Sequence, residues 1–261
     1  MSTKNRRKKR VSSTEILRRI VLVLSILVFV SCAVLLILDY LPNVETPDSG
    51  FLDKADIFDN SQSFQDEKSE ILVNINNMRK ENPDMVGFIS IKGMKINYPI
   101  VKGEDNDYYL HYNFYRKKDR KGTIMLDAYS DEKTSLNWLI YGHSMKNRTM
   151  FGSLRDFTKK SFYNDHKSMI VTMHDEVAVF DIFAVCYTAV YPSDDPRFKY
   201  HYYGNIFTEN DYNEYVANIK KLSLYDTGIT PQFGEQLVTL STCRESNSPR
   251  RIVVVARRRS E

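Results

Sequence analysis

The stretch "QLVTLSTCRESNSPRRIVVVARR", residues 236–258, holds two apolar runs joined by a short polar segment. Both runs are rich in β-branched and aliphatic residues, so they predict two β-strands with a turn between them. If the strands pair, this short connection brings Cys243, Arg250 and Arg251 to the same end of a sheet. Side chains alternate along a strand, so the two arginines face opposite sides and only one of them can point toward Cys243.

Cys243 has four interpretations at this point: a buried structural thiol, half of a disulfide, a metal ligand or a nucleophile. A nucleophilic thiol acts as the thiolate, which a nearby cation such as Arg251 would stabilise. A metal site is disfavoured, because the sequence contains no Cys-x-x-Cys and no His-x-x-x-His pair. The candidate disulfide partner is Cys186, but its strand-like run, residues 180–190, is more typical of a small buried hydrophobe.

Of the histidines, His143 has the most suggestive position. It closes the apolar run "NWLIYGH", residues 137–143, directly after Gly142. A histidine at a strand end can reach a cleft and act as a general acid or base, although taken alone this one is also typical of a turn. The remaining histidines have polar neighbours and are expected on the surface or in loops; they are His111, His166, His174 and His201.

The N-terminal region combines a basic cluster with an uncharged apolar segment. The cations of the cluster are Lys4, Arg6, Arg7, Lys8, Lys9, Arg10, Arg18 and Arg19. Residues 20–38, "IVLVLSILVFVSCAVLLIL", contain no charge, proline or glycine and are long enough for one helical crossing of a bilayer. The excess of cations on the N-terminal side predicts that residues 1–19 are cytoplasmic and that the rest of the chain is extracellular.

We interpret residues 20–38 as an uncleaved transmembrane signal anchor. A cleaved signal peptide is the alternative, but its apolar core is usually shorter, and no small-residue cleavage site follows Leu38. Lipoprotein cleavage at Cys32 is disfavoured because the apolar run continues past it. The net charge of +4 arises from the basic cluster, so it does not indicate a nucleic-acid partner, which would require a basic patch on the folded domain.

The rest of the chain is predicted to be a linker, residues 39–63, followed by one globular domain, residues 64–261. Apolar spacing predicts a helix at the start of this domain and a second one over residues 208–222, which opens with a capping-box-like Thr208 and Asp211. Short strand-like runs cover residues 85–91, 96–101, 123–129, 137–143, 168–173, 177–191, 236–243 and 251–257. The domain is therefore expected to be mostly β with added helices, as a barrel or a sandwich.

Three motifs in this order resemble the sortases: "YGH" at 141–143, "TLSTC" at 239–243 and "RIVVVA" at 251–256. The segment 82–127, "NPDMVGFISIKGMKINYPIVKGEDNDYYLHYNFYRKKDRKGTIMLD", and the helix before the cysteine strand are similar to class B sortases in particular. The resemblance covers residues 64–258. It implies an eight-stranded sortase β-barrel that needs no cofactor.

The resemblance also implies a cysteine transpeptidase. Such an enzyme cuts a C-terminal sorting signal, Asn-Pro-x-Thr-Asn or a Pro-x-Thr-Gly variant, after its threonine and holds the protein as a thioester. It then passes the secreted protein to an amine of a peptidoglycan precursor or to a pilin lysine. The expected setting is the outer face of the membrane, where exported proteins and wall precursors pass.

Carried over by position, Cys243 is the nucleophile and His143 exchanges protons with the leaving and incoming amines. Arg251 binds substrate and stabilises the oxyanion. It is preferred to Arg250 because it keeps the family's spacing from arginine to alanine. The positions implied to bind substrate are Asn106, Leu110, Ser241 and Thr242. Arg244 departs from the pattern, because some relatives carry an acidic residue there.

Three other functions remain open. A cysteine peptidase that hydrolyses wall peptides would share the thioester and differ only in using water, although such enzymes usually place cysteine before histidine in the chain. A pilin-polymerising sortase would differ in its acceptor amine. A membrane-anchored adhesion or scaffold barrel would keep Cys243 buried and unreactive.

Overall fold

The computed structural model describes residues 13–40, 61–243 and 250–260, and it divides the chain into an N-terminal unit up to Glu45 and a globular unit from Thr46 onward. Most of the predicted linker, residues 41–60, lies outside the described residues, as do the predicted cytoplasmic residues 1–12. The two units are therefore described separately.

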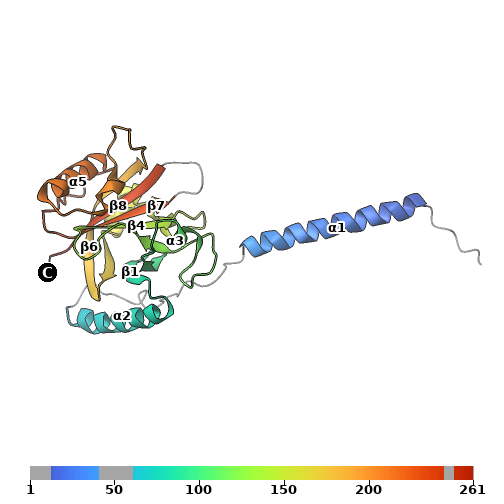
Figure 1. Cartoon of the computed structure of the whole chain (residues 1–261), viewed down its shortest axis with the longest axis horizontal. Helices are drawn as coiled ribbons and strands as arrows, with labels where there is room; N and C mark the ends of the chain where they lie inside the picture. The colour runs from blue at the N-terminus through green and yellow to red at the C-terminus, as the bar shows by residue number, and fades with distance from the viewer. Residues whose placement is uncertain (1–12, 41–60, 244–249, 261) are drawn as a thin grey trace, which may run out of the picture. The chain divides into compact units, whose positions relative to one another are not determined.

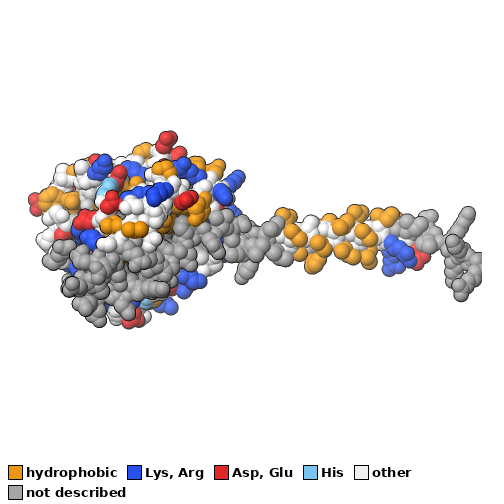
Figure 2. All heavy atoms as spheres, turned by 90° about the horizontal axis from the view of Figure 1, so that it is seen from below, with side chains coloured by type: hydrophobic (Ala, Val, Ile, Leu, Met, Phe, Trp, Pro, Cys, Tyr) orange, Lys and Arg blue, Asp and Glu red, His pale blue; other side chains and the backbone are white. Residues whose placement is uncertain are grey.

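The N-terminal unit contains the helix α1, Ser13–Tyr40. Within it, Leu17–Leu35 form a candidate membrane span of 19 residues with a mean hydropathy of 2.3, and none of this window is buried against the protein. Apolar side chains cover this part of the helix (Figure 2), and the sequence places Arg18 and Arg19 near its start. At about 1.5 Å per residue, 19 residues extend about 28 Å, which matches the hydrocarbon core of a bilayer.

The described part of the globular unit forms a closed barrel of eight strands, as the resemblance implied. The strands are β1 Met85–Ile91, β2 Ile96–Val101, β3 Ile124–Leu126, β4 Asn137–His143, β5 Ser168–Met173, β6 Glu176–Ala189, β7 Leu237–Cys243 and β8 Arg250–Arg258. Around the barrel their order is β1-β2-β3-β4-β7-β8-β6-β5. The pairs β2–β3 and β4–β7 are parallel, and the other neighbours are antiparallel.

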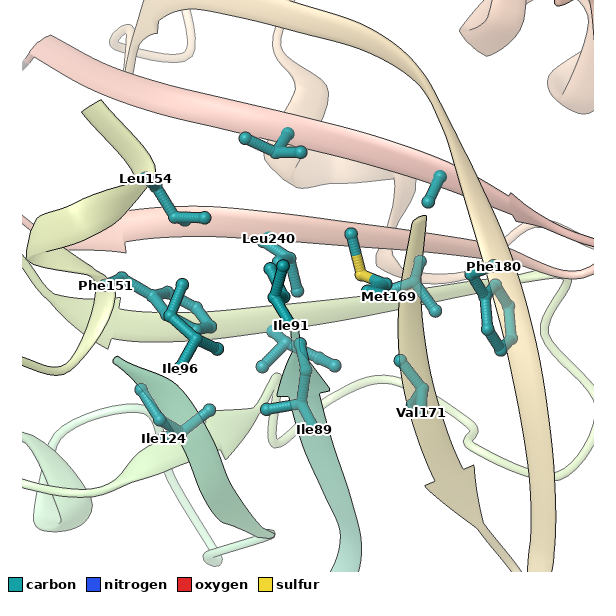
Figure 3. Close-up of a cluster of buried hydrophobic side chains, with 14 of the residues drawn as sticks. Ile89, Ile91, Ile96, Ile124, Phe151, Leu154, Met169, Val171, Phe180 and Leu240 are labelled. Atoms are coloured by element: carbon teal, nitrogen blue, oxygen red, sulfur yellow. The ribbon is translucent and has the colours of Figure 1, made fainter. Parts of the chain in front are cut away.

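The barrel interior is filled by aliphatic and aromatic side chains that point toward one another from facing strands (Figure 3). Ile89 and Ile91 from β1 share this cluster with Leu240 from β7 and Phe180 from β6. Alternation along each strand places one set of side chains in this interior and leaves the other set for the outer face. The strands therefore carry apolar residues on both faces where a helix covers the barrel.

The predicted helices are present. α2, Ser61–Glu81, packs Ile71 and Ile75 against the barrel, and α5, Glu209–Leu222, covers the outer face of β6, β7 and β8 (Figure 1). Thr208 caps α5 as expected, because its side chain accepts a hydrogen bond from the backbone N–H of Asp211 at 3.1 Å.

Shorter helical turns were not predicted from the sequence. These are α3 Tyr108–His111, η2 Phe151–Thr158, α4 Lys160–Asp165 and η3 Tyr200–Gly204. They are too short to show a helical period in the sequence, and their large buried side chains, such as Tyr109, Phe151 and Tyr200, are held by the barrel instead. Two of them, α3 and η3, lie close to the candidate site.

Candidate active site

The candidate site lies at the end of the parallel strand pair β4–β7. In this pair the register runs from Asn137 opposite Leu237 to His143 opposite Cys243. The two residues are 100 positions apart in the sequence, yet each is the last residue of its strand. For Cys243 the structure describes the backbone, while its side chain and residues 244–249, Arg244 among them, lie outside the described residues.

Strand β8 adds Arg251 to the same end of the sheet. Its antiparallel pairing with β7 reaches Ser241 opposite Val253, and the backbone N–H of Ile252 donates to Thr242 Oγ1 at 2.9 Å. Arg251 directly precedes Ile252 on β8. On the side of β8 that faces β6, it pairs with Thr188. The pairing of these two strands, expected from the sequence, is therefore present.

The two arginines face opposite sides of β8, as alternation predicted. Val253 and Val255 pack on the outer face beneath α5, whereas Val254 and Ala256 point into the barrel. Arg251 belongs to the outer series. On β4 the outer series includes Leu139 and, four residues on, His143, so His143 and Arg251 share the outer face.

His143 is fixed by the backbone of the segment around α3. Its Nε2 lies 2.9 Å from the carbonyl oxygen of Leu110. A carbonyl oxygen only accepts hydrogen bonds, so Nε2 carries the hydrogen and, in the neutral ring, Nδ1 is the basic nitrogen. Leu110, which the resemblance implied to bind substrate, thus contacts His143 through its backbone.

Asp127 joins two neighbouring parts of the site. Its Oδ2 accepts hydrogen bonds from Asn106 Nδ2 and from the Tyr141 hydroxyl, both at 3.1 Å. Asn106 is held further because its Oδ1 accepts from the backbone N–H of Ala128 at 2.8 Å. Asp127 is 8% exposed, so this small network is largely shielded from water. It places Asn106 beside Tyr141, two residues before His143.

This geometry was compared with known proteins. The family model for the sortase domain matches residues 89–259. The chain belongs to the sortase family. Sortases are cysteine transpeptidases, and the fold class and enzyme class expected from the sequence are confirmed.

The relatives identify this sortase as class B. Sortase B of Listeria monocytogenes is 33% identical over 176 residues, which cover 67% of this chain and 68% of that protein. A mutant form of Clostridium perfringens sortase B superimposes with a TM-score of 0.69 at 27% identity, covering 83% of this chain and 99% of the other. A Staphylococcus aureus sortase B–substrate complex superimposes with a TM-score of 0.65 at 27% identity, covering 76% of this chain and 94% of the other.

In this sortase the side chains of Ser241 and Thr242 are buried and make hydrogen bonds within the protein. Ser241 Oγ lies 2.8 Å from the Tyr200 hydroxyl oxygen. Thr242 Oγ1 accepts the hydrogen bond from the backbone N–H of Ile252 on β8. These contacts join β7 to η3 and β8. Their predicted contact with substrate remains a prediction, as it does for Asn106 and Leu110, which are both partly exposed.

Residues that the sequence did not single out also belong to this part of the sortase. Asp127 directly follows β3, and Tyr141 lies two residues before the end of β4. The available signal for Asp127 was a carboxylate directly after the apolar run "TIML".

His201 of η3 is partly buried, and this burial lowers its pKa. The positive charges of Lys199 and Arg251 lower the pKa as well, whereas the negative charge of Asp127 raises it. His201 therefore shares an electrostatic environment with Arg251.

Cys186 is not a partner of Cys243. It is a free thiol, fully buried beneath α5, and its Sγ donates to the carbonyl oxygen of Ile219 at 3.4 Å. Burial raises the pKa of this thiol to about 12, so it stays protonated and unreactive at neutral pH. The interpretation of Cys186 as a buried hydrophobe is confirmed. In the described part of the chain no group of His, Cys, Asp and Glu side chains could hold a metal ion.

Proposed function

We propose that this sortase is anchored in the cell membrane and cuts a sorting signal of the Asn-Pro-x-Thr-Asn or Pro-x-Thr-Gly type after its threonine, with Cys243 as nucleophile and His143 as general acid and base. The register that pairs His143 with Cys243 at the end of β4 and β7 is the observation that carries the proposal. The S. aureus relative solved with a substrate supports a peptide donor.

The first half-reaction forms a thioester. The Cys243 thiolate attacks the carbonyl carbon of the threonine, and the tetrahedral intermediate collapses when the C–N bond breaks. His143, with Nε2 held by Leu110, donates a proton from Nδ1 to the leaving amine. The neutral ring that remains can accept a proton from the next amine.

Arg251 is the candidate for stabilising charge in both half-reactions. It shares the outer face with His143, and its positive charge lies where β7 and β8 end together. A positive donor at this place would favour the thiolate and the oxyanion of the tetrahedral intermediate. Removing one such donor typically costs about 3 kcal/mol of transition-state stabilisation.

The second half-reaction transfers the protein to an amine of a peptidoglycan precursor. The anchor supports this setting: Leu17–Leu35 can span a bilayer, and the cations before it favour a cytoplasmic N-terminus and an extracellular catalytic domain. A secreted protein with a C-terminal sorting signal would meet the enzyme there. The peptide bond is exchanged through the thioester, so no external energy source is required.

The full chain in detergent, incubated with a panel of peptides of both motif types with and without an amine acceptor, tests this function. We expect cleavage after threonine and, with acceptor present, an amide product in the mass spectrum. Cleavage that ignores the acceptor would favour a hydrolytic cysteine peptidase. A folded enzyme that forms neither product nor acyl adduct with any peptide would contradict the proposal.

The position of His143 should depend on Gly122, which lets the chain pass close to Leu110. Gly122 has a φ of +60°, and an added Cβ would lie 2.8 Å from the Leu110 carbonyl oxygen and 2.5 Å from that of Tyr109. Because Leu110 holds His143, we expect Gly122→Ala to slow peptide cleavage about 10- to 100-fold. The measurement is the cleavage rate of a peptide from the panel.

Gly228→Ala is the matched control for this prediction. Gly228 has a φ of +79° and nothing within 4 Å of an added Cβ, so it carries the same kind of backbone strain without displacing a neighbour. We expect both variants to lose about 1 kcal/mol or more of stability, but only Gly122→Ala to slow the reaction. Equal loss of rate in the two variants would mean that strain alone is responsible.

A further inference from the structure

The strand pairings bring two connecting segments to the end of the barrel where β4 and β7 end. β4 is antiparallel to β3, and β3 is parallel to β2, so β2 begins at this end. The turn from β1 to β2, residues 92–95, therefore lies here, and so does the connection from β4 to β5, residues 144–167. We call these two segments together the cap.

The two segments of the cap pack on the barrel and on each other. Phe151, Leu154 and Phe157 of η2 belong to the interior cluster, so the longer segment closes the barrel at this end. Gly93 of the turn lies against the ring of His166, because an added Cβ would be 3.1 Å from its Nε2. The cap is therefore one surface of the folded protein.

The cap is strongly basic, although the globular part of the chain is not. Residues 92–95 and 144–167 contain eight cations and only two carboxylates, which gives the cap a net charge of +6. Residues 1–40 also contain eight cations and two carboxylates, so residues 41–261 as a whole have a net charge of −2. Positive charge is therefore concentrated in the cap. Its cations are Lys92, Lys95, Lys146, Arg148, Arg155, Lys159, Lys160 and Lys167.

Several of these lysines are available to a charged partner outside the protein. Lys95, Lys159 and Lys160 are exposed, and none of them forms an ion pair with another residue that the structure describes. Arg148, by contrast, pairs with Asp156 at 2.5 Å. Lysine ammonium groups that gather on one surface without carboxylates favour a partner with many negative charges.

The cap also presents apolar side chains among its lysines. Met94, Met145 and Phe162 are partly exposed, and they pack against the interior cluster from this end. A surface that combines lysines with partly exposed apolar side chains suits the boundary between the headgroups and the acyl chains of a bilayer. The lysine stems can cover apolar surface while their ammonium groups reach the phosphates.

The chain itself supplies a reason to prefer a bilayer to another polyanion. Leu17–Leu35 can span a membrane, and only residues 41–60 separate α1 from α2. Fully extended, 20 residues reach at most about 70 Å, whereas a domain of about 200 residues is only about 40 Å across. The globular unit is thus confined near the bilayer, and the connection is long enough for any side of it to face the lipid.

We propose that the cap docks on the surface of a bilayer that contains anionic phospholipid. This inference rests on the proposed membrane anchoring. The lysines bind the lipid phosphates, and the apolar side chains between them enter the interface. Ser144 of the cap directly follows His143. Docking would therefore hold the end of β4 and β7 at the membrane surface, where a membrane-bound acceptor is confined.

The test measures how close the cap comes to lipid in the anchored full chain. A fluorescent dye is attached to Asn164→Cys, an exposed position on α4, in a chain with Cys32→Ala and Cys243→Ala; Cys186 is buried and stays unlabelled. The protein is placed in nanodiscs of phosphatidylcholine alone or mixed with phosphatidylglycerol, with a quencher on some headgroups. We expect strong quenching only with phosphatidylglycerol, and loss of that quenching at high salt.

Neutralising lysines of the cap should release it from the membrane. Each basic residue near an anionic surface favours binding about fivefold, so removing three should lower the ratio of docked to free protein about 100-fold. The variant is the triple substitution Lys95→Gln, Lys159→Gln and Lys160→Gln. Without the dye and with Cys243 intact, it should cleave a soluble peptide at the wild-type rate, which shows that the fold and the site are retained.

The control removes the same charge from exposed lysines outside the cap, on α2, the connection from β3 to β4, and α5. It is the triple substitution Lys80→Gln, Lys133→Gln and Lys221→Gln. This variant should stay quenched in phosphatidylglycerol nanodiscs. Equal loss of quenching in the two triple variants would overturn the inference, because net charge and not the cap would then hold the domain.

Two further results would also overturn it. One is quenching that does not depend on phosphatidylglycerol. The other is a cap that binds a soluble polyphosphate but stays away from the lipid, which would indicate a wall polymer as its partner. Co-purification of the chain with the nanodisc is measured in the same samples. If the chain remains in the nanodisc without quenching, only the docking inference has failed, and if it does not remain there, the proposed anchoring has failed.

Discussion

Replacing Cys243 by alanine should abolish thioester formation. Without the sulfur no covalent intermediate can form, and removal of a catalytic nucleophile costs on the order of 10⁶ in rate in the best-studied covalent proteases. The measurement is the mass of the enzyme after incubation with a cleavable peptide, which should show an acyl adduct for wild type and none for Cys243→Ala. Release of the C-terminal peptide fragment should disappear with it.

Cys186→Ala is the matched control for this variant. Cys186 is fully buried and its pKa is raised to about 12, so we expect Cys186→Ala to keep the acyl adduct and to lose only some stability through the small cavity that it creates. A thiol-directed reagent should likewise modify Cys243 at neutral pH and leave Cys186 unmodified in the folded protein. An acyl adduct that persists in Cys243→Ala would show that another residue is the nucleophile.

Replacing His143 by glutamine should lower the cleavage rate about 10²- to 10⁴-fold. The glutamine amide can still donate a hydrogen bond to the Leu110 carbonyl oxygen, so the local structure is expected to be retained. It cannot give a proton to the leaving amine or take one from the acceptor. The variant therefore separates proton transfer from the structural role of the same side chain.

His174→Gln is the corresponding control, because His174 Nε2 also lies close to a backbone carbonyl oxygen, that of Glu132 at 3.0 Å, but on the exposed turn between β5 and β6. It should leave the cleavage rate unchanged. A rate within threefold of wild type for His143→Gln would contradict the proposed role.

Much of the barrel could be predicted because its strands are short runs with strong local signals. Short apolar, β-rich runs bounded by turn residues mark β1, β2 and β5 closely, and the capping of α5 by Thr208 follows from local chemistry alone. The opposite facing of Arg250 and Arg251 follows from the pleat of a strand in the same way. Such features depend on neighbours in the sequence.

The arrangement around His143 could not be predicted in this way. The hydrogen bond from its Nε2 joins residues 33 positions apart, and its acceptor is the backbone carbonyl oxygen of Leu110. Every residue has such an oxygen, so the side chain of Leu110 gives no sign of this contact in the sequence. The contact of Asp127 with Asn106 and Tyr141 depends on how β3 and the loop before it reach β4.

The sequence by itself determined the apolar segment within α1 and the succession of strand-like runs along the chain, because these depend on side-chain type and local spacing. The residues proposed for catalysis came from the resemblance of three ordered motifs to the sortases. Only the tertiary structure decided that β4 pairs with β7 in parallel and so sets His143 opposite Cys243. It also decided which backbone carbonyl orients that histidine. Parallel pairing between distant strands is chosen by closure of the whole barrel and by the packing of its interior, which no single segment encodes.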